Sequence, residues 1–184
     1  MSQFGESAIA RWLTSSSPDP AIANEAWYHD RPAMLRTGGA YDAVRMPRML
    51  VHAAAESSVP DVVAGFLAEV LDGPVICHPG AWYYALVPPG TCETWPCAEA
   101  VVRGRGGWLG IPRPDRTEAA SVNPYWAVPV QRRGTLCAPG EVANLLRVGR
   151  ARVEGVGTEQ DGLGGGPFHR YTPGYWPRRA DETP

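Results

Sequence analysis

Residues 75–90 read VICHPGAWYYALVPPG, which is two apolar runs separated by His78-Pro79-Gly80. The second run, Trp82 to Val87, is aromatic and aliphatic throughout and ends at Pro88-Pro89-Gly90. It therefore predicts the strongest strand in the chain. Val75 to Cys77 predicts a shorter strand before it. Two such runs joined by a short turn with Pro and Gly indicate a β-hairpin.

Upstream of the hairpin, the sequence predicts one strand and two helices. Residues 41–46 alternate in character and predict a strand. Pro47 suits the first turn of a helix, which we expect over residues 47–57. A second helix is expected from Ser58, its N-cap, to Asp72-Gly73-Pro74, where it ends. Its apolar residues recur with i, i+3, i+4 spacing: Val62, Val63, Phe66, Leu67, Val70 and Leu71.

Downstream of the hairpin, we expect three short strands and one helix. The strands are predicted at residues 100–102, 108–111 and 125–130. Pro129 favours an edge position or the end of the last strand, because proline cannot donate to a sheet hydrogen bond. Apolar residues at helical spacing predict the final helix over residues 139–150.

These elements predict an α+β fold with one core of short, largely antiparallel strands and two to three helices, over residues 39–152. Residues 1–38 are expected to be an irregular N-terminal extension with one short helix near residues 6–13. Residues 153–184 are expected to be a flexible tail rich in Gly and Pro. Such a segment buries too little apolar area to offset about 1–2 kcal/mol of backbone entropy per residue.

Composition places the chain among turn-rich globular proteins. It holds 21 Gly and 19 Pro in 184 residues, and all 17 of its basic residues are Arg. The absence of Lys is typical of a GC-rich genome, which suggests an actinomycete source. Residues 1–17 lack the pattern of a signal peptide, and no apolar run is long enough to cross a membrane. We therefore expect a cytoplasmic protein with no membrane partner.

The four cysteines do not have the spacing of a structural zinc site. Cys92 and Cys97 form one loose pair, while Cys77 and Cys137 stand alone. Structural zinc sites usually contain paired short spacings such as C-x2-C. We expect reduced core thiols, no bound metal and no cofactor.

Charge is divided unevenly along the chain. Residues 1–99 carry 5 Arg and 11 acidic residues, whereas residues 100–153 carry 9 Arg and 3 acidic residues. A basic segment of this kind indicates nucleic-acid contact, because guanidinium groups bind phosphates bidentately. The flanking glycines let a ligand approach the backbone closely, and a tryptophan lies next to the loop. The candidate nucleic-acid-binding residues are Arg103, Arg105, Trp108, Arg113, Arg116, Arg132 and Arg133.

Two other interpretations of these arginines stay open. They can be solvated or paired with the acidic N-terminal half of the same chain. They can also bind an acidic protein partner. The first of these predicts stability effects on mutation, and the second predicts binding to a protein in place of DNA.

The sequence carries no complete catalytic constellation, so we do not expect an enzyme. The chain has four isolated histidines, no G-x-S-x-G motif and no Lys to complete a phosphate loop. It also lacks carboxylates paired on a predicted strand to hold Mg²⁺.

Four stretches carry a resemblance to a known group of proteins: residues 41–47, 82–91, 103–114 and 125–129. In these stretches the chain resembles small actinobacterial proteins that look like truncated N-terminal modules of bifunctional primase–polymerases. Such proteins occur in or near integrative conjugative elements. The chain departs from the polymerases themselves, because it lacks their D-x-D metal pair on a strand and their later catalytic His.

The resemblance implies a non-enzymatic accessory or regulatory protein, such as a replication activator, that promotes replication or transfer of its element. It would act through DNA or through the element's replication initiator. The alternative is a protein–protein interaction module without nucleic-acid contact.

Overall fold

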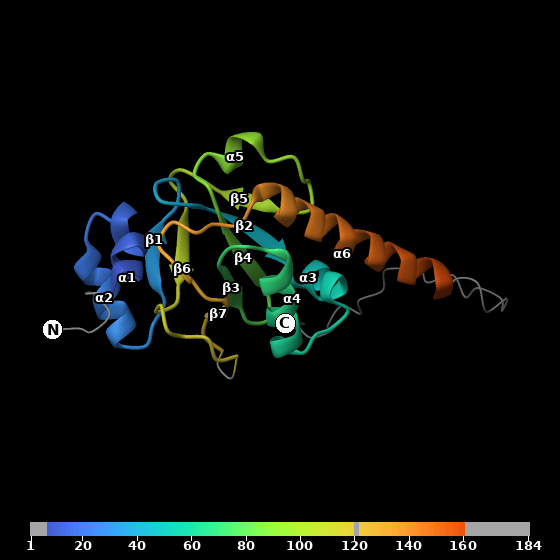
Figure 1. Ribbon diagram of the computed structural model, residues 1–184, viewed down its shortest axis with the longest axis horizontal. Helices are drawn as coiled ribbons and strands as arrows, with labels where there is room; N and C mark the ends of the chain where they lie inside the picture. Colours follow the sequence, from blue (N-terminus) through green and yellow to red (C-terminus); the bar gives the residue numbers. More distant parts are fainter. Residues whose placement is uncertain (1–6, 120–121, 161–184) are drawn as a thin grey trace, which may run out of the picture.

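The computed structural model describes residues 7–119 and 122–160, with side chains up to residue 155. Its centre is a five-stranded antiparallel sheet in the order β5-β2-β4-β3-β7 (Figure 1). The strands are β2 (Asp42–Pro47), β3 (Val75–His78), β4 (Trp82–Val87), β5 (Val101–Arg103) and β7 (Tyr125–Val128). The predicted β3–β4 hairpin is present, and β7 is an edge strand that ends just before Pro129. The predicted α+β class is confirmed.

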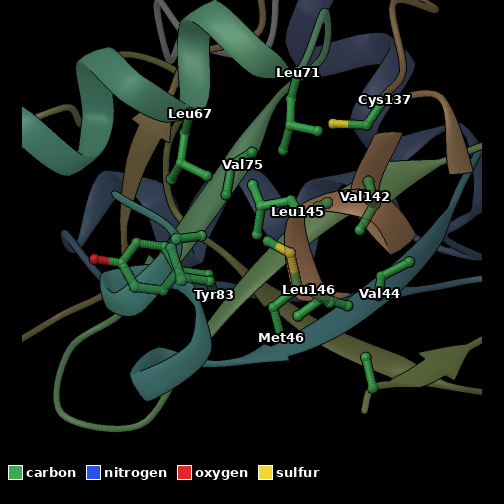
Figure 2. Packing of buried hydrophobic residues seen from close by; sticks show 14 of the residues in the cluster. Val44, Met46, Leu67, Leu71, Val75, Tyr83, Cys137, Val142, Leu145 and Leu146 are labelled. Atoms are coloured by element: carbon green, nitrogen blue, oxygen red, sulfur yellow. The ribbon is translucent and has the colours of Figure 1, made fainter. Parts of the chain in front are cut away.

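Three helices cover one face of this sheet: α3 (Arg48–Ala55), α4 (Pro60–Val70) and α6 (Pro139–Gln160). Alternate residues of the strands, such as Val44 and Tyr83, point toward these helices and form the first core with Leu67 and Leu146 (Figure 2). Close packing of α6 on α3 requires Gly149. A Cβ at that position would lie 2.1 Å from the Leu50 carbonyl oxygen.

The structure corrects the expected irregular extension over residues 1–38. Within its described part lie α1 (Ala8–Leu13), a 3-10 turn η1 (Thr14–Ser16), α2 (Pro20–Tyr28) and strand β1 (Ala33–Arg36). Strand β1 pairs antiparallel with β6 (Trp108–Ile111) in a separate two-stranded sheet. This layer covers the other face of the large sheet (Figure 1).

A second core lies between the two sheets and explains why the N-terminal residues fold. Trp27 and Leu35 are fully buried there beside Ile111 and Trp126. The Trp27 indole N–H donates to the Ile111 carbonyl at 3.0 Å. The pairing partner of β1 lies about 75 residues further along the chain, so no local pattern could reveal this strand.

The remaining differences concern element boundaries. Helix α4 begins after Val59, not at the expected cap Ser58, and the Ser57 hydroxyl accepts the Val59 N–H at 3.1 Å. Helix α6 continues to Gln160, past the expected start of the tail at residue 153. A short helix α5 (Thr91–Thr94) follows β4. The rest of the expected tail, residues 161–184, lies outside the described residues.

None of the helices within the described ranges combines the length and apolar character needed to cross a membrane.

Candidate nucleic-acid interface

The glycine-rich loop at residues 103–107 connects the two sheets and is fixed in place by Thr37. The loop leaves the large sheet at the end of β5 and enters the small sheet at Trp108. The Thr37 hydroxyl donates to the Gly104 carbonyl at 2.6 Å, and its backbone N–H donates to the Gly107 carbonyl at 3.0 Å. The loop therefore has a defined position although it is rich in glycine.

Gly38 allows the loop to approach the end of β1 closely. Its φ is +91°, and a Cβ there would lie 2.3 Å from the Arg105 Cα. Only glycine combines this left-handed conformation with the absence of a side chain. Gly38 thus positions the Arg105 backbone directly beside the segment that follows Arg36.

A hollow of about 600 Å³ opens where these segments meet. Its lining residues include Arg36 and Arg105 and the three hydroxyl residues Ser15, Ser16 and Thr37. The Ser15 and Thr37 hydroxyls donate to backbone carbonyls, whereas the Ser16 hydroxyl accepts the Ala40 N–H and keeps its own proton for a ligand. Within the described part of the chain, no carboxylate lines it. The two guanidinium groups and the Ser16 hydroxyl, without a competing acid among the described lining residues, match the chemistry of a phosphate group.

A second hollow of about 420 Å³ adjoins the first, because Ser15 lines both. It brings Arg11 of α1 beside Arg133 and again has no carboxylate among its described lining residues. Four arginines from distant parts of the chain thus lie around η1. We call Arg11, Arg36, Arg105 and Arg133 the basic face. All four are exposed, and within the described ranges none lies within ion-pair distance of a carboxylate.

Trp108 lies beside the basic face on the outer side of the small sheet. Its side chain is 42% exposed, which is high for a tryptophan. Arg36 is its direct cross-strand partner, and the Arg36 Cζ lies 5.1 Å from the centre of the indole ring. Such a cation–π contact holds the two exposed side chains together.

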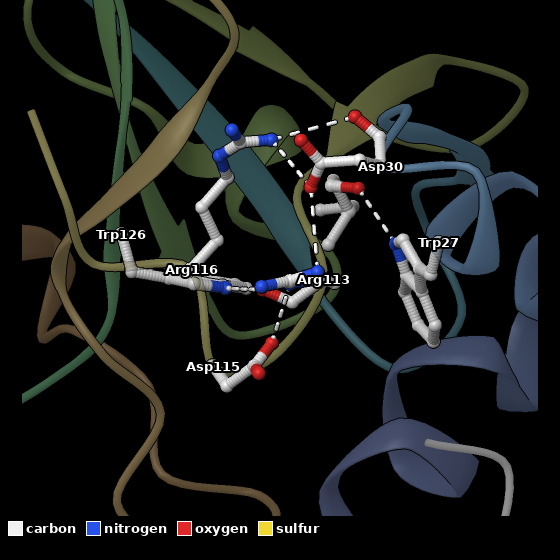
Figure 3. A network of polar contacts seen from close by, with 7 residues as sticks. Trp27, Asp30, Arg113, Asp115, Arg116 and Trp126 are labelled. Atoms are coloured by element: carbon white, nitrogen blue, oxygen red, sulfur yellow. Dashed lines mark hydrogen bonds and ion pairs between the residues drawn. The ribbon is translucent and has the colours of Figure 1, made fainter. Parts of the chain in front are cut away.

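Two of the predicted residues are engaged elsewhere. Arg113 and Arg116 both contact Asp30, with N–O distances of 3.5 and 2.8 Å, and Arg113 also contacts Asp115 at 2.9 Å (Figure 3). Trp126 adds to this network by donating from its indole N–H to the Arg113 carbonyl at 3.1 Å. For these two arginines the contacts match the internal-pairing interpretation.

The other predicted residues are distributed as follows. Arg105 and Arg133 belong to the basic face, and Arg132 is exposed in the same turn as Arg133. Arg103 is half-buried at the start of the glycine-rich loop. Sequence reasoning missed Arg11 and Arg36, because both belong to the segment counted as acidic. The Gly38-Gly39 pair after Arg36-Thr37 indicates a turn, but it does not indicate which residues that turn contacts.

Three of the four cysteines are buried as expected, whereas Cys92, also expected in the core, is exposed. Burial raises the pKa of the Cys97 thiol to about 11 and that of Cys137 to about 12. Burial also raises the pKa of Cys77, which lies between the Tyr83 and Tyr125 hydroxyls. These three thiols are therefore protonated at neutral pH. Over the described residues, no group of three or more His, Cys, Asp or Glu side chains is arranged to hold a metal ion.

Comparison with known proteins adds no relative: no family model, no curated protein and no solved structure matches the chain.

Proposed function

We propose that this protein binds nucleic acid through the basic face, with Arg36 and Arg105 holding a backbone phosphate. The observation that carries this proposal is the hollow lined by both arginines and by Ser16, with no carboxylate among its described lining residues. Arg11 and Arg133 extend the positive surface to the neighbouring hollow. Trp108 adds an aromatic surface for bases, which favours single strands.

The biological role in this proposal comes from the resemblance described above. The protein would act in the cytoplasm as a non-enzymatic accessory or regulatory factor for replication or transfer of an actinomycete integrative element. Nucleic-acid binding through the basic face would bring it to the element's DNA. A contact with the element's replication initiator is the other route by which the same role can be fulfilled.

Salt-dependent binding tests the proposal. The Arg36→Ala/Arg105→Ala double variant should bind DNA more weakly than wild type. The slope of log K against log salt should fall by about 0.9 for each phosphate interaction that the substitutions remove on a duplex, or about 0.7 on a single strand. The matched control is Arg147→Ala/Arg150→Ala, which removes the same charge from the exposed side of α6.

The control variant distinguishes an effect of the basic face from an effect of the protein's net charge. If both double variants lose affinity equally, net charge and not the basic face determines binding. Wild-type protein that binds neither duplex nor single-stranded DNA at low salt would refute the proposal. Melting curves must be the same for all the variants, so that unfolding does not imitate a loss of binding.

A protein-interaction module is the second candidate, and a specific groove favours it. A hollow of about 440 Å³ between α2 and β1 is lined largely by apolar side chains, among them Ile22, Met34 and Trp108. Ile22 and Met34 are 66% and 59% exposed, and Asp19 and Glu25 line the same groove. Ile22→Ser should weaken binding of a protein partner here and leave DNA binding unchanged, whereas Arg36→Ala/Arg105→Ala should do the reverse.

A further inference from the structure

A second arginine–tryptophan pair lies on the large sheet, apart from the basic face. The Arg45 Cζ lies 4.5 Å from the centre of the Trp82 ring. Arg45 belongs to β2 and Trp82 to the adjacent strand β4, and both side chains are only half-buried. The core buries this pair only in part, because part of each side chain still faces solvent.

The face of the large sheet that carries Arg45 and Trp82 has a further arginine at its exposed end. Residues directly paired across strands point to the same side of a sheet. Arg45 pairs with Val101, which is 56% exposed, and Ala43 pairs with Arg103. Since Ala43 and Arg45 are two residues apart, Arg103 lies on the same side as the Arg45–Trp82 pair.

Contacts at Gly110 connect this second pair to Trp108. His78 is the cross-strand partner of Trp82, and its Nε2–H donates to the Gly110 carbonyl at 3.1 Å. The Cβ position of Gly110 lies 3.6 Å from both His78 Cε1 and Met34 Sδ. Gly110 is two residues from Trp108 along β6, a distance of about 7 Å. A run of partly exposed side chains therefore leads from Trp108 past Met34 and His78 to Trp82.

We propose that this run of side chains is a binding track for single-stranded nucleic acid, in which Trp82 with Arg45 forms a second stacking platform. The inference rests on the proposed function, because the basic face supplies the phosphate contacts at one end. Bases of a duplex are paired and stacked inside the helix, so they cannot use two separated planar platforms. An unpaired strand offers its bases to both tryptophans and to the guanidinium planes above them.

The track makes a prediction about ligand length. A strand that reaches both platforms should bind more tightly than one that reaches only Trp108. Non-specific single-strand sites of comparable size span roughly 4–16 nucleotides. Oligothymidylates of 4, 8 and 16 nucleotides, together with a blunt 16-base-pair duplex, are therefore suitable probes for fluorescence anisotropy with the full chain.

Trp82→Ala is the decisive variant, and Tyr28→Ala is its control, because Tyr28 is an aromatic residue that is 70% exposed outside the track. Trp82→Ala should weaken binding of the 16-mer by roughly 5- to 150-fold, the range expected when base stacking is removed. Its affinity for the duplex should stay unchanged. Tyr28→Ala should bind all four probes as wild type does.

Photo-crosslinking of the wild-type protein keeps the test independent of how variants fold. A 16-mer with 5-iodouracil at alternate positions should crosslink to peptides that contain Trp82 and Trp108. If Trp82→Ala binds the 16-mer as wild type does and only Trp108 crosslinks, the track is refuted while the basic face stands. Failure of the wild-type protein to bind any of the probes would refute the proposed function and the track together.

Discussion

The substitution Asp30→Asn tests whether Arg113 and Arg116 serve to pair within the chain or to bind a ligand. Asp30 has a φ of +56°, a left-handed conformation that both Asp and Asn tolerate better than most residues. The substitution therefore removes the negative charge while the backbone at this position stays acceptable. Asn also keeps a carbonyl oxygen that can still accept one neutral hydrogen bond.

The expected cost follows from the exposure of the groups. Arg116 is 18% exposed and lies 2.8 Å from Asp30, whereas Arg113 is 35% exposed at 3.5 Å. Partly exposed pairs each contribute about 0.2–1 kcal/mol, and Arg116 should be near the upper end. We expect a loss of about 1 kcal/mol in the free energy of unfolding. For a chain of this size that lowers Tm by about 2–4 °C.

Thermal and urea unfolding at low and high salt provide the assay. The difference between Asp30→Asn and wild type should shrink in 0.5 M NaCl, because salt screens exposed charges. Glu154→Gln is the control, since the exposed Arg150–Glu154 pair at 2.6 Å should contribute less. Equal stability of Asp30→Asn and wild type at low salt would refute the reasoning. A gain in DNA affinity by Asp30→Asn would mean that the released arginines can reach the ligand.

Three further predictions concern the backbone and pH. Gly38→Ala should lower Tm and weaken DNA binding, because its Cβ would clash with the loop backbone in a left-handed conformation. Gly149→Ala should lower the free energy of unfolding by about 1–3 kcal/mol by separating α6 from α3, whereas Gly140→Ala, with open space around it, should not. Burial lowers the pKa of His78, although its hydrogen bond to the Gly110 carbonyl acts in the opposite direction. The unfolded chain therefore takes up this proton at a higher pH than the folded protein does. Stability should therefore decline as pH falls below about 6.5, and His78→Gln should flatten that decline in pH-dependent urea titrations.

Local signals predicted most of the large sheet and the helices on it. The β3–β4 hairpin, β2 and the helices α3 and α4 all follow from periodicity and turn residues close in sequence. Strand β6 was predicted too, but its partner was not. Its pairing with β1 brings together residues about 75 positions apart, and β1 has only four residues. No pattern within a window of ten to twenty residues can report such a contact.

In the candidate site, too, residues within one sequence segment were predicted, whereas residues whose role depends on long-range contacts were not. Arg105 and Trp108 were predictable, because they lie within one basic, glycine-rich segment. Arg36 was not, since its relevance depends on the pairing of β1 with β6. Asp30 was equally hidden, and it determines that Arg113 and Arg116 pair within the chain.

The net charge of a sequence segment therefore does not by itself identify a binding surface. Beside Arg150 and Arg152, which pair with Glu154 and Glu56, two groups of arginines after residue 100 have contrasting uses in the structure. One part is compensated by a carboxylate of the N-terminal layer at Asp30. The other part, Arg105 and Arg133, is joined by Arg11 and Arg36 from that same layer, in hollows without a lining carboxylate among the described residues. The small N-terminal layer thus neutralises one group of arginines and completes the other, so the positive field is concentrated around η1. If the proposed function is correct, substitutions in the N-terminal layer should alter DNA binding as strongly as substitutions in the arginine-rich segment.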